Sequence, residues 1–258
     1  MPTSVITRLA LEIDPPLARI TLQNPPLNVI DIPMMKELAQ VLGDLEARRD
    51  ISIIKLEGNA RAFSAGVDVK AHVPEQVREM LTSFHAVIRA IVASRKITIA
   101  AVQGMCLGGG AELAAICDMV YTARDAVWGF PEIKLGCYPP VAAVALPLLV
   151  GQKRASELIF TARQISGDEA AAIGLANRSV LAEELGAVVE EAIDQLWALS
   201  PIALAHAKKS VYAWDAIHFD KGLARAEKIY LEELIQTDDA REGIAAFMEK
   251  RPPKWTGQ

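Results

Sequence analysis

The chain changes its pattern near Gly151, and this change limits the folds that it can adopt. Before Gly151, short apolar segments alternate with amphipathic helical patterns, whereas almost every later segment has the 3.6-residue spacing of a helix. Strands that alternate with helices, followed by helices alone, are typical of an α/β core with a helical C-terminal part. We therefore expect the α/β fold class.

The strand-like segments are short and rich in β-branched or aromatic residues, as buried strands are. They cover residues 18–22, 52–56, 98–102 and 119–122. Apolar residues at helical spacing predict helices over residues 34–45, 77–91, 108–117, 155–161, 168–173, 183–199, 202–215, 222–234 and 239–249.

Composition argues against several classes of protein. Among 258 residues, 27 are Lys or Arg and 32 are Asp or Glu, and this net charge of −5 disfavours nucleic-acid binding through bulk charge. The three cysteines form no CxxC pair and the four histidines no HxxxH or HExxH pair, so we expect a reducing compartment and no metal site. We find no secretory pattern, and the most apolar run, residues 141–150, is too short to cross a bilayer. We expect a cytoplasmic protein without a membrane partner.

One candidate ligand site is the segment 63–70, with the sequence FSAGVDVK. Its small residues and its glycine allow a ligand to approach the backbone closely, and glycine permits a turn that other residues cannot make. The alternative is an ordinary loop between a strand and a helix.

The second candidate is the glycine triplet Gly108, Gly109 and Gly110 at the start of a predicted helix. Each glycine costs roughly 0.5–1 kcal/mol relative to Ala inside regular structure, which suggests a need for bare backbone N–H groups. The first amides of a helix lack partners and favour negative charge. No Gly-Lys-Ser/Thr follows, so this is not a phosphate-binding P-loop. The alternative is close packing of a helix on a strand.

Two carboxylates, Glu112 and Glu132, lie among apolar residues. Two carboxyl groups in one dry site can be pushed to different pKa values and can then serve as acid and base. Glu112 can also act as a simple cap in the first helical turn, and Lys134 is available to pair with Glu132. The sequence alone does not show that the two carboxylates meet.

These segments together resemble the crotonase superfamily, also called the enoyl-CoA hydratase/isomerase family. The similar segments are NPPLN at 24–28, FSAGVDVK at 63–70, residues 104–118, FPE at 130–132 and residues 237–251. The resemblance implies a spiral of ββα repeats over residues 1–200. It also implies a helical region over residues 201–258 that mediates trimers, which often pair into hexamers.

The resemblance also implies the reaction centre. The backbone N–H groups of Val67 and Gly109 would form an oxyanion hole for the thioester carbonyl of an acyl-CoA. Glu112 would act as base on a water molecule, and Glu132 would exchange the proton at the α-carbon.

Further positions match family residues that hold the CoA moiety. These are Ala65, Asp68, Val69 and Lys70, together with Phe247 and Lys250 near the C-terminus. An exposed helix charge is the alternative for Lys70. The family needs no cofactor beyond the CoA of its substrate.

Two positions depart from common members of the family. Dienoyl-CoA isomerases and aryl-CoA dehalogenases have an aspartate near the position of Pro140, and typical hydratases have a glutamine where this chain has Phe130. With Tyr138 nearby, the pattern is similar to the subgroup that hydrates cyclic dienoyl-CoA, such as cyclohexa-1,5-diene-1-carbonyl-CoA. The alternative is that these aromatic residues belong to the core.

We therefore predict an enoyl-CoA hydratase-type lyase that adds water to an unsaturated acyl-CoA. The first alternative is a double-bond isomerase on the same scaffold, which needs only one carboxylate. The second is a non-catalytic RNA-binding role, which the net charge of −5 disfavours.

Overall fold

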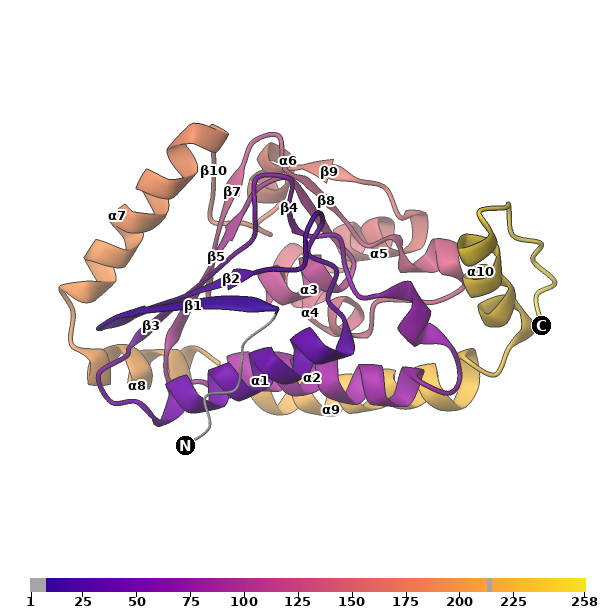
Figure 1. Ribbon diagram of the computed structural model, residues 1–258, viewed down its shortest axis with the longest axis horizontal. Coiled ribbons are helices and arrows are strands. Elements are labelled where there is room, and N and C mark those ends of the chain that lie inside the picture. The colour runs from indigo at the N-terminus through magenta and orange to yellow at the C-terminus, as the bar shows by residue number, and fades with distance from the viewer. Residues whose placement is uncertain (1–7, 213–214) are drawn as a thin grey trace.

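The computed structural model describes residues 8–212 and 215–258, and the strands in this part of the chain form two sheets. The larger sheet has the order β1-β2-β3-β5-β7-β10, and the smaller has the order β4-β6-β8-β9 (Figure 1). The strands are β1 (Leu9–Asp14), β2 (Leu17–Leu22), β3 (Ile53–Glu57), β4 (Ala62–Ser64), β5 (Ile97–Val102), β6 (Met105–Leu107), β7 (Met119–Ala123), β8 (Val127–Gly129), β9 (Ile165–Ser166) and β10 (Arg178–Val180).

From β3 to β8, successive strands alternate between the two sheets, which makes the core a spiral. β3, β5 and β7 pair in parallel in the larger sheet, while β4, β6 and β8 pair in parallel in the smaller one. Each pair of strands is followed by a helix: α2 (Val77–Ala93), α3 (Gly109–Ala115) or α4 (Pro140–Val150). The predicted ββα repeat is confirmed.

Three long helices lie side by side along one side of the molecule: α1 (Ile32–Ala47), α2 and α9 (Asp215–Ile229) (Figure 1). α1 forms where Leu38, Val41 and Leu45 recur at helical spacing, and all three are buried. The Asp31 carboxylate caps α1 by accepting a hydrogen bond from the Met34 amide at 2.9 Å.

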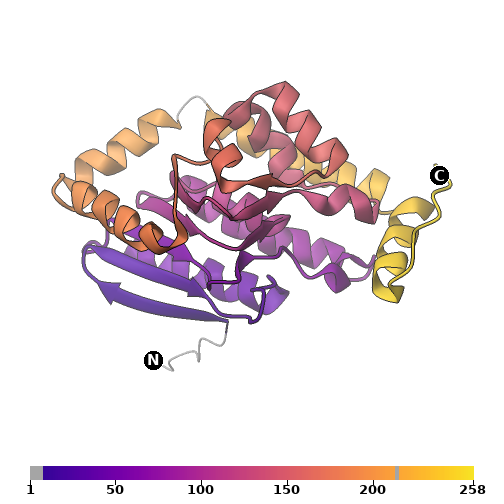
Figure 2. The same ribbon diagram turned by 90° about the horizontal axis from the view of Figure 1, so that it is seen from above.

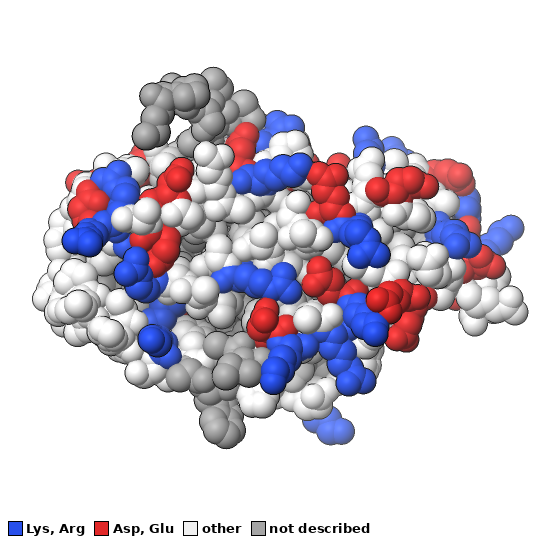
Figure 3. All heavy atoms as spheres, turned by 90° about the horizontal axis from the view of Figure 1, so that it is seen from below, with Lys and Arg blue, Asp and Glu red and all other residues white. Residues whose placement is uncertain are grey.

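On the outer surface of this layer, basic and acidic side chains are interspersed (Figure 3). Lys36 of α1 pairs with Glu79 of α2 at 2.7 Å, and Arg89 of α2 pairs with Asp220 of α9 at 3.0 Å. Each of these exposed ion pairs contributes little to stability. This face shows no broad patch of a single charge.

A second core lies between the larger sheet and α7 (Leu185–Trp197). Ile53, Ile99 and Val189 are fully buried there. The centre of the larger sheet is therefore covered on both faces, and its strand β5 is buried at all six positions.

The remaining helices are α5 (Gln152–Thr161), α6 (Gly167–Ala172), α8 (Pro201–Val211) and α10 (Asp238–Glu249). α10 lies at the end of the molecule opposite α8 (Figures 1 and 2). It packs on two short 3₁₀ helices, η1 (Val69–His72) and η2 (Pro131–Leu135). The helix predicted over 202–215 ends earlier, at Val211, and its residues 213–214 lie outside the described residues.

Two expectations about local structure need correction. Residues 140–150 form α4, which the sequence did not predict as a helix because the segment is apolar on every face and contains Pro147. The helix predicted over 222–234 ends in a π-helical turn, Tyr230–Leu234, instead of continuing as α-helix.

Candidate active site

The start of α3 packs directly against the segment that follows β4. A Cβ on Gly110 would lie 2.6 Å from the Ser64 carbonyl oxygen, and one on Gly109 would lie 2.6 Å from Cγ2 of Val67. A side chain at either glycine would push the two segments apart. The two glycine-containing motifs of the sequence therefore meet, and close packing accounts for part of the triplet.

Two backbone amides at this junction are left without partners. The Val67 and Gly109 N–H groups form no hydrogen bond within the described residues, and a Cβ on Gly109 would lie 3.5 Å from the Val67 nitrogen. Gly109 is the first residue of α3, where amides have no partner within the helix. Two free donors at one place can bind an oxygen that carries negative charge.

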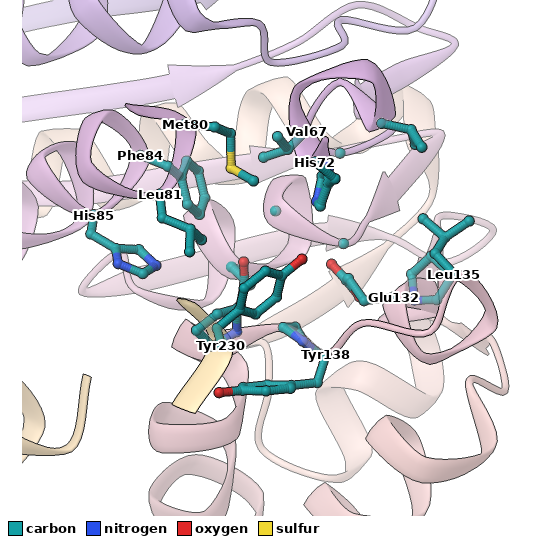
Figure 4. A pocket seen from close by; sticks show the side chains of 18 of the residues that line it. Val67, His72, Met80, Leu81, Phe84, His85, Glu132, Leu135, Tyr138 and Tyr230 are labelled. Atoms are coloured by element: carbon teal, nitrogen blue, oxygen red, sulfur yellow. The ribbon is translucent and has the colours of Figure 1, made fainter. Parts of the chain in front are cut away.

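A cavity of about 80 Å³ opens beside these amides (Figure 4). Val67, Gly108 and Gly109 form one side of it, and Glu112 and Glu132 both reach it. The structure therefore brings together the two carboxylates that the sequence singled out.

Glu112 projects from the first turn of α3 and is only 3% exposed. Its Oε1 accepts a hydrogen bond from the Ala142 amide of α4 at 2.8 Å. Burial raises the pKa of Glu112 to about 7, against the lowering effect of the Ala142 and Val141 amides. Near neutral pH this group can accept or release a proton.

Glu132 enters the cavity from η2. Its Oε1 would lie 2.6 Å from a Cβ on Gly108, which has a φ of +51°, so this glycine provides both the turn and the space. Oε2 is sealed from solvent and has no hydrogen-bond partner within the described residues. Burial, and next the Glu112 charge, raise the pKa of Glu132 well above its usual value. Lys134 is exposed, and in the described chain it does not bond to Oε2 of Glu132.

The sequence did not predict the other polar side chains of the cavity wall, which are His72, His85 and Tyr230. Nδ1 of His72 is hydrogen-bonded to the Asp68 carbonyl oxygen at 3.1 Å, and burial lowers the pKa of His72. His85 is fully buried and lies 3.6 Å from the Glu227 carboxylate. Both histidines look like ordinary core or surface residues in the sequence, because no ligand spacing marks them.

The predicted CoA-binding residues lie in different environments. Ala65 and Val69 line the cavity, whereas Lys70 is exposed. The Asp68 carboxylate caps η1 by accepting from the Lys70 amide at 3.1 Å, so this residue also has a structural role.

The two C-terminal candidates lie away from the cavity wall. Phe247 is 54% exposed on α10, and Lys250 ends that helix in the left-handed conformation. Neither lines the cavity within the described part of the chain.

The described residues contain neither a metal-binding cluster nor a membrane-spanning helix. No group of three or more His, Cys, Asp or Glu side chains has a metal-binding arrangement there. No helix among residues 8–212 and 215–258 is long and apolar enough to cross a membrane.

Fold and site together define a spiral α/β protein with paired carboxyl groups at one cavity, and comparison with known families gives its class. Residues 12–258 match the family described as enoyl-CoA hydratase/isomerase. The chain belongs to the enoyl-CoA hydratase/isomerase family, which confirms the predicted family and enzyme class.

Named relatives and solved structures span almost the whole chain. A cyclohexa-1,5-dienecarbonyl-CoA hydratase from Thauera aromatica is 37% identical, with 95% of each chain covered. A probable enoyl-CoA hydratase from Bacillus subtilis is 33% identical, covering 97% of this chain and 99% of the relative. The crystal structure of an enoyl-CoA hydratase from Mycobacterium avium subsp. paratuberculosis superposes with a TM-score of 0.88 at 25% identity, covering 97% and 99%. The crotonase-type fold is thus confirmed.

Proposed function

We propose that this enzyme adds water to an α,β-unsaturated acyl-CoA thioester, or removes it in the reverse direction. The observation that carries this proposal is that one cavity holds two buried carboxyl groups beside two amides that have no partner among the described residues. A double-bond isomerase needs one group to move a proton, whereas two carboxyl groups of raised pKa suit a reaction that also activates water.

The proposed reaction assigns one task to each group. The Glu112 carboxylate takes a proton from water, whose oxygen forms a bond to the β-carbon. The electron pair of the double bond moves toward the thioester oxygen, where the Val67 and Gly109 amides stabilise the negative charge. The Glu132 carboxylic acid then delivers its proton to the α-carbon.

A compact cyclic acyl group suits the cavity better than a long straight chain. The cavity holds about 80 Å³, and Phe84, Tyr138, Pro140 and Tyr230 stand around it. The relative from Thauera aromatica carries the name of a cyclic dienoyl-CoA hydratase, which supports the same choice. We propose a cyclic dienoyl-CoA as the preferred substrate.

The proposal includes two properties beyond the reaction centre. Ala65, Asp68, Val69 and Lys70 hold the CoA moiety, and Phe247 and Lys250 contribute at its outer end. The chain assembles as a homotrimer or as a hexamer of two trimers.

Turnover in water enriched in heavy oxygen tests the reaction type. A panel of cyclic and linear enoyl-CoA thioesters is incubated with the enzyme, and the products are examined by mass spectrometry. We expect one labelled oxygen in each hydrated product and the highest kcat/KM for the cyclic dienoyl ester. Turnover without label would show isomerisation and would overturn the proposal.

A further inference from the structure

Tyr230 is buried in the wall of the cavity, and its hydroxyl group is left unsatisfied by the described part of the chain. The residue is 1% exposed, and its oxygen has no hydrogen-bond partner among the described residues. An unpaired buried hydroxyl costs about 1–3 kcal/mol, so a ligand that satisfies it is expected.

The hydroxyl end of Tyr230 points toward the Glu132 carboxyl group (Figure 4). Glu132 Oε2 is also buried and also lacks a partner within the described chain. Two unsatisfied polar atoms therefore face the same small space. A water molecule needs two to four polar partners, and this space offers a donor and an acceptor.

The protein holds the Tyr230 ring firmly. Its centroid lies 5.4 Å from that of the Tyr138 ring, at an interplanar angle of 58°. The Tyr138 hydroxyl donates to the Ala226 carbonyl oxygen at 2.5 Å, one turn before Tyr230. Tyr230 also begins the π-helical turn that ends α9, and π-helical turns are frequent at functional sites.

The protonation state of Tyr230 suits a hydrogen-bond donor. Burial, and then the nearby Cys137 and Glu132, raise the pKa of Tyr230 well above its usual value, so the phenol keeps its proton. The Cys137 thiol is a further polar neighbour, but a thiol sulfur is only a weak acceptor.

We propose that Tyr230 is a third catalytic residue, whose hydroxyl donates a hydrogen bond to the oxygen of the reacting water. This inference rests on the proposed function. The water donates to the two glutamates and accepts from Tyr230. As the Glu112 carboxylate takes the water proton and the C–O bond forms, the oxygen carries partial negative charge. The Tyr230 hydrogen bond then strengthens, and Tyr230 keeps its own proton throughout.

The Tyr230→Phe variant tests this role, with hydration and α-proton exchange measured side by side. Hydration is followed with cyclohexa-1,5-dienecarbonyl-CoA. Exchange is followed in heavy water with cyclohexanecarbonyl-CoA, which has an α-proton but no double bond to hydrate. Exchange needs Glu132 and the oxyanion amides, but it does not need the reacting water.

We expect the hydration kcat of the variant to fall by about 10- to 100-fold, as for a lost hydrogen bond to a charged group, while KM and the exchange rate stay within about threefold. Cys137→Ala, which removes the neighbouring thiol and keeps the hydroxyl, should retain wild-type kcat. A melting curve checks that each variant folds.

Two results would overturn the role of Tyr230. Either hydration by Tyr230→Phe stays within twofold of wild type, or hydration and exchange fall together by the same factor. Failure of the proposed function looks different, because the wild-type enzyme itself would then exchange the α-proton without hydrating the diene.

Discussion

At the residue scale, the site keeps two carboxyl groups in an environment that disfavours their charge. Glu112 has backbone amides to offset part of its burial, whereas Glu132 Oε2 has no partner among the described residues. Sequence spacing and family resemblance were enough to single out both acids. They were not enough for Tyr230, because its position in a helical pattern far along the chain is that of any core residue.

The pKa of Glu112 sets the acid side of the pH profile. Its value of about 7 means that a growing fraction is protonated as pH falls below 7, and a protonated base cannot take a proton from water. We expect kcat/KM for hydration to fall about tenfold per pH unit below pH 7. A profile measured from pH 5 to 9 checks this, and a flat profile between pH 5 and 7 would contradict Glu112 as the base.

Glu132→Gln should separate activity from binding. The amide cannot deliver a proton, so we expect kcat to fall by about 10²–10⁴ while CoA-ester affinity, measured by calorimetry, changes little. Glu12→Gln, on the exposed part of β1, is the control and should keep full activity. An equal loss of affinity and turnover would argue against the assigned role.

Glu132→Gln should also be more stable than the wild-type protein at alkaline pH. The pKa of Glu132 is raised in the folded protein, because burial favours the uncharged carboxyl group. The contribution of Glu132 to the stability of the fold is therefore complete below the unfolded-state pKa and is lost as pH rises through the folded-state pKa. Urea unfolding at pH 5 and pH 9 should show a gain for Glu132→Gln only at pH 9. A gain of the same size at both pH values would show that ionisation of Glu132 is not its cause.

At the scale of elements, the helix α3 depends on glycine for its position. A Cβ at Gly110 would meet the Ser64 carbonyl oxygen at 2.6 Å and the Ser64 Cβ at 2.7 Å. We expect Gly110→Ala to lower the free energy of unfolding by about 1–3 kcal/mol through overpacking. It should also reduce kcat, because the shift moves the Gly109 amide away from Val67.

Gly43→Ala is the matched control for this prediction. Gly43 lies inside α1, where an added Cβ meets nothing within 4 Å, so alanine should raise stability by about 0.5–1 kcal/mol. Urea unfolding of both variants gives the comparison. If Gly110→Ala is as stable and active as wild type, close packing does not explain the triplet.

The elements that the sequence predicted well are those long enough to show a clear burial pattern. β5 has six buried residues in a row, and α2 buries one apolar face along its length. The strands β4, β6 and β8 have three residues each, too few for a two-residue alternation to be recognised. Their parallel pairing depends on contacts between distant parts of the chain, and the resemblance, not local pattern, implied them.

At the scale of the whole molecule, the described single chain leaves apolar surface exposed on the C-terminal helical part. Ile202 and Val211 of α8 are 70% and 72% exposed. Large apolar side chains at such exposure suit a surface between subunits. We therefore expect light scattering to give a mass about three or six times the 27.9 kDa of one chain. Replacing both residues with lysine should lower that mass, whereas Leu181→Lys, outside this part, should keep it. A wild-type mass of one chain at micromolar concentration would contradict the proposed assembly.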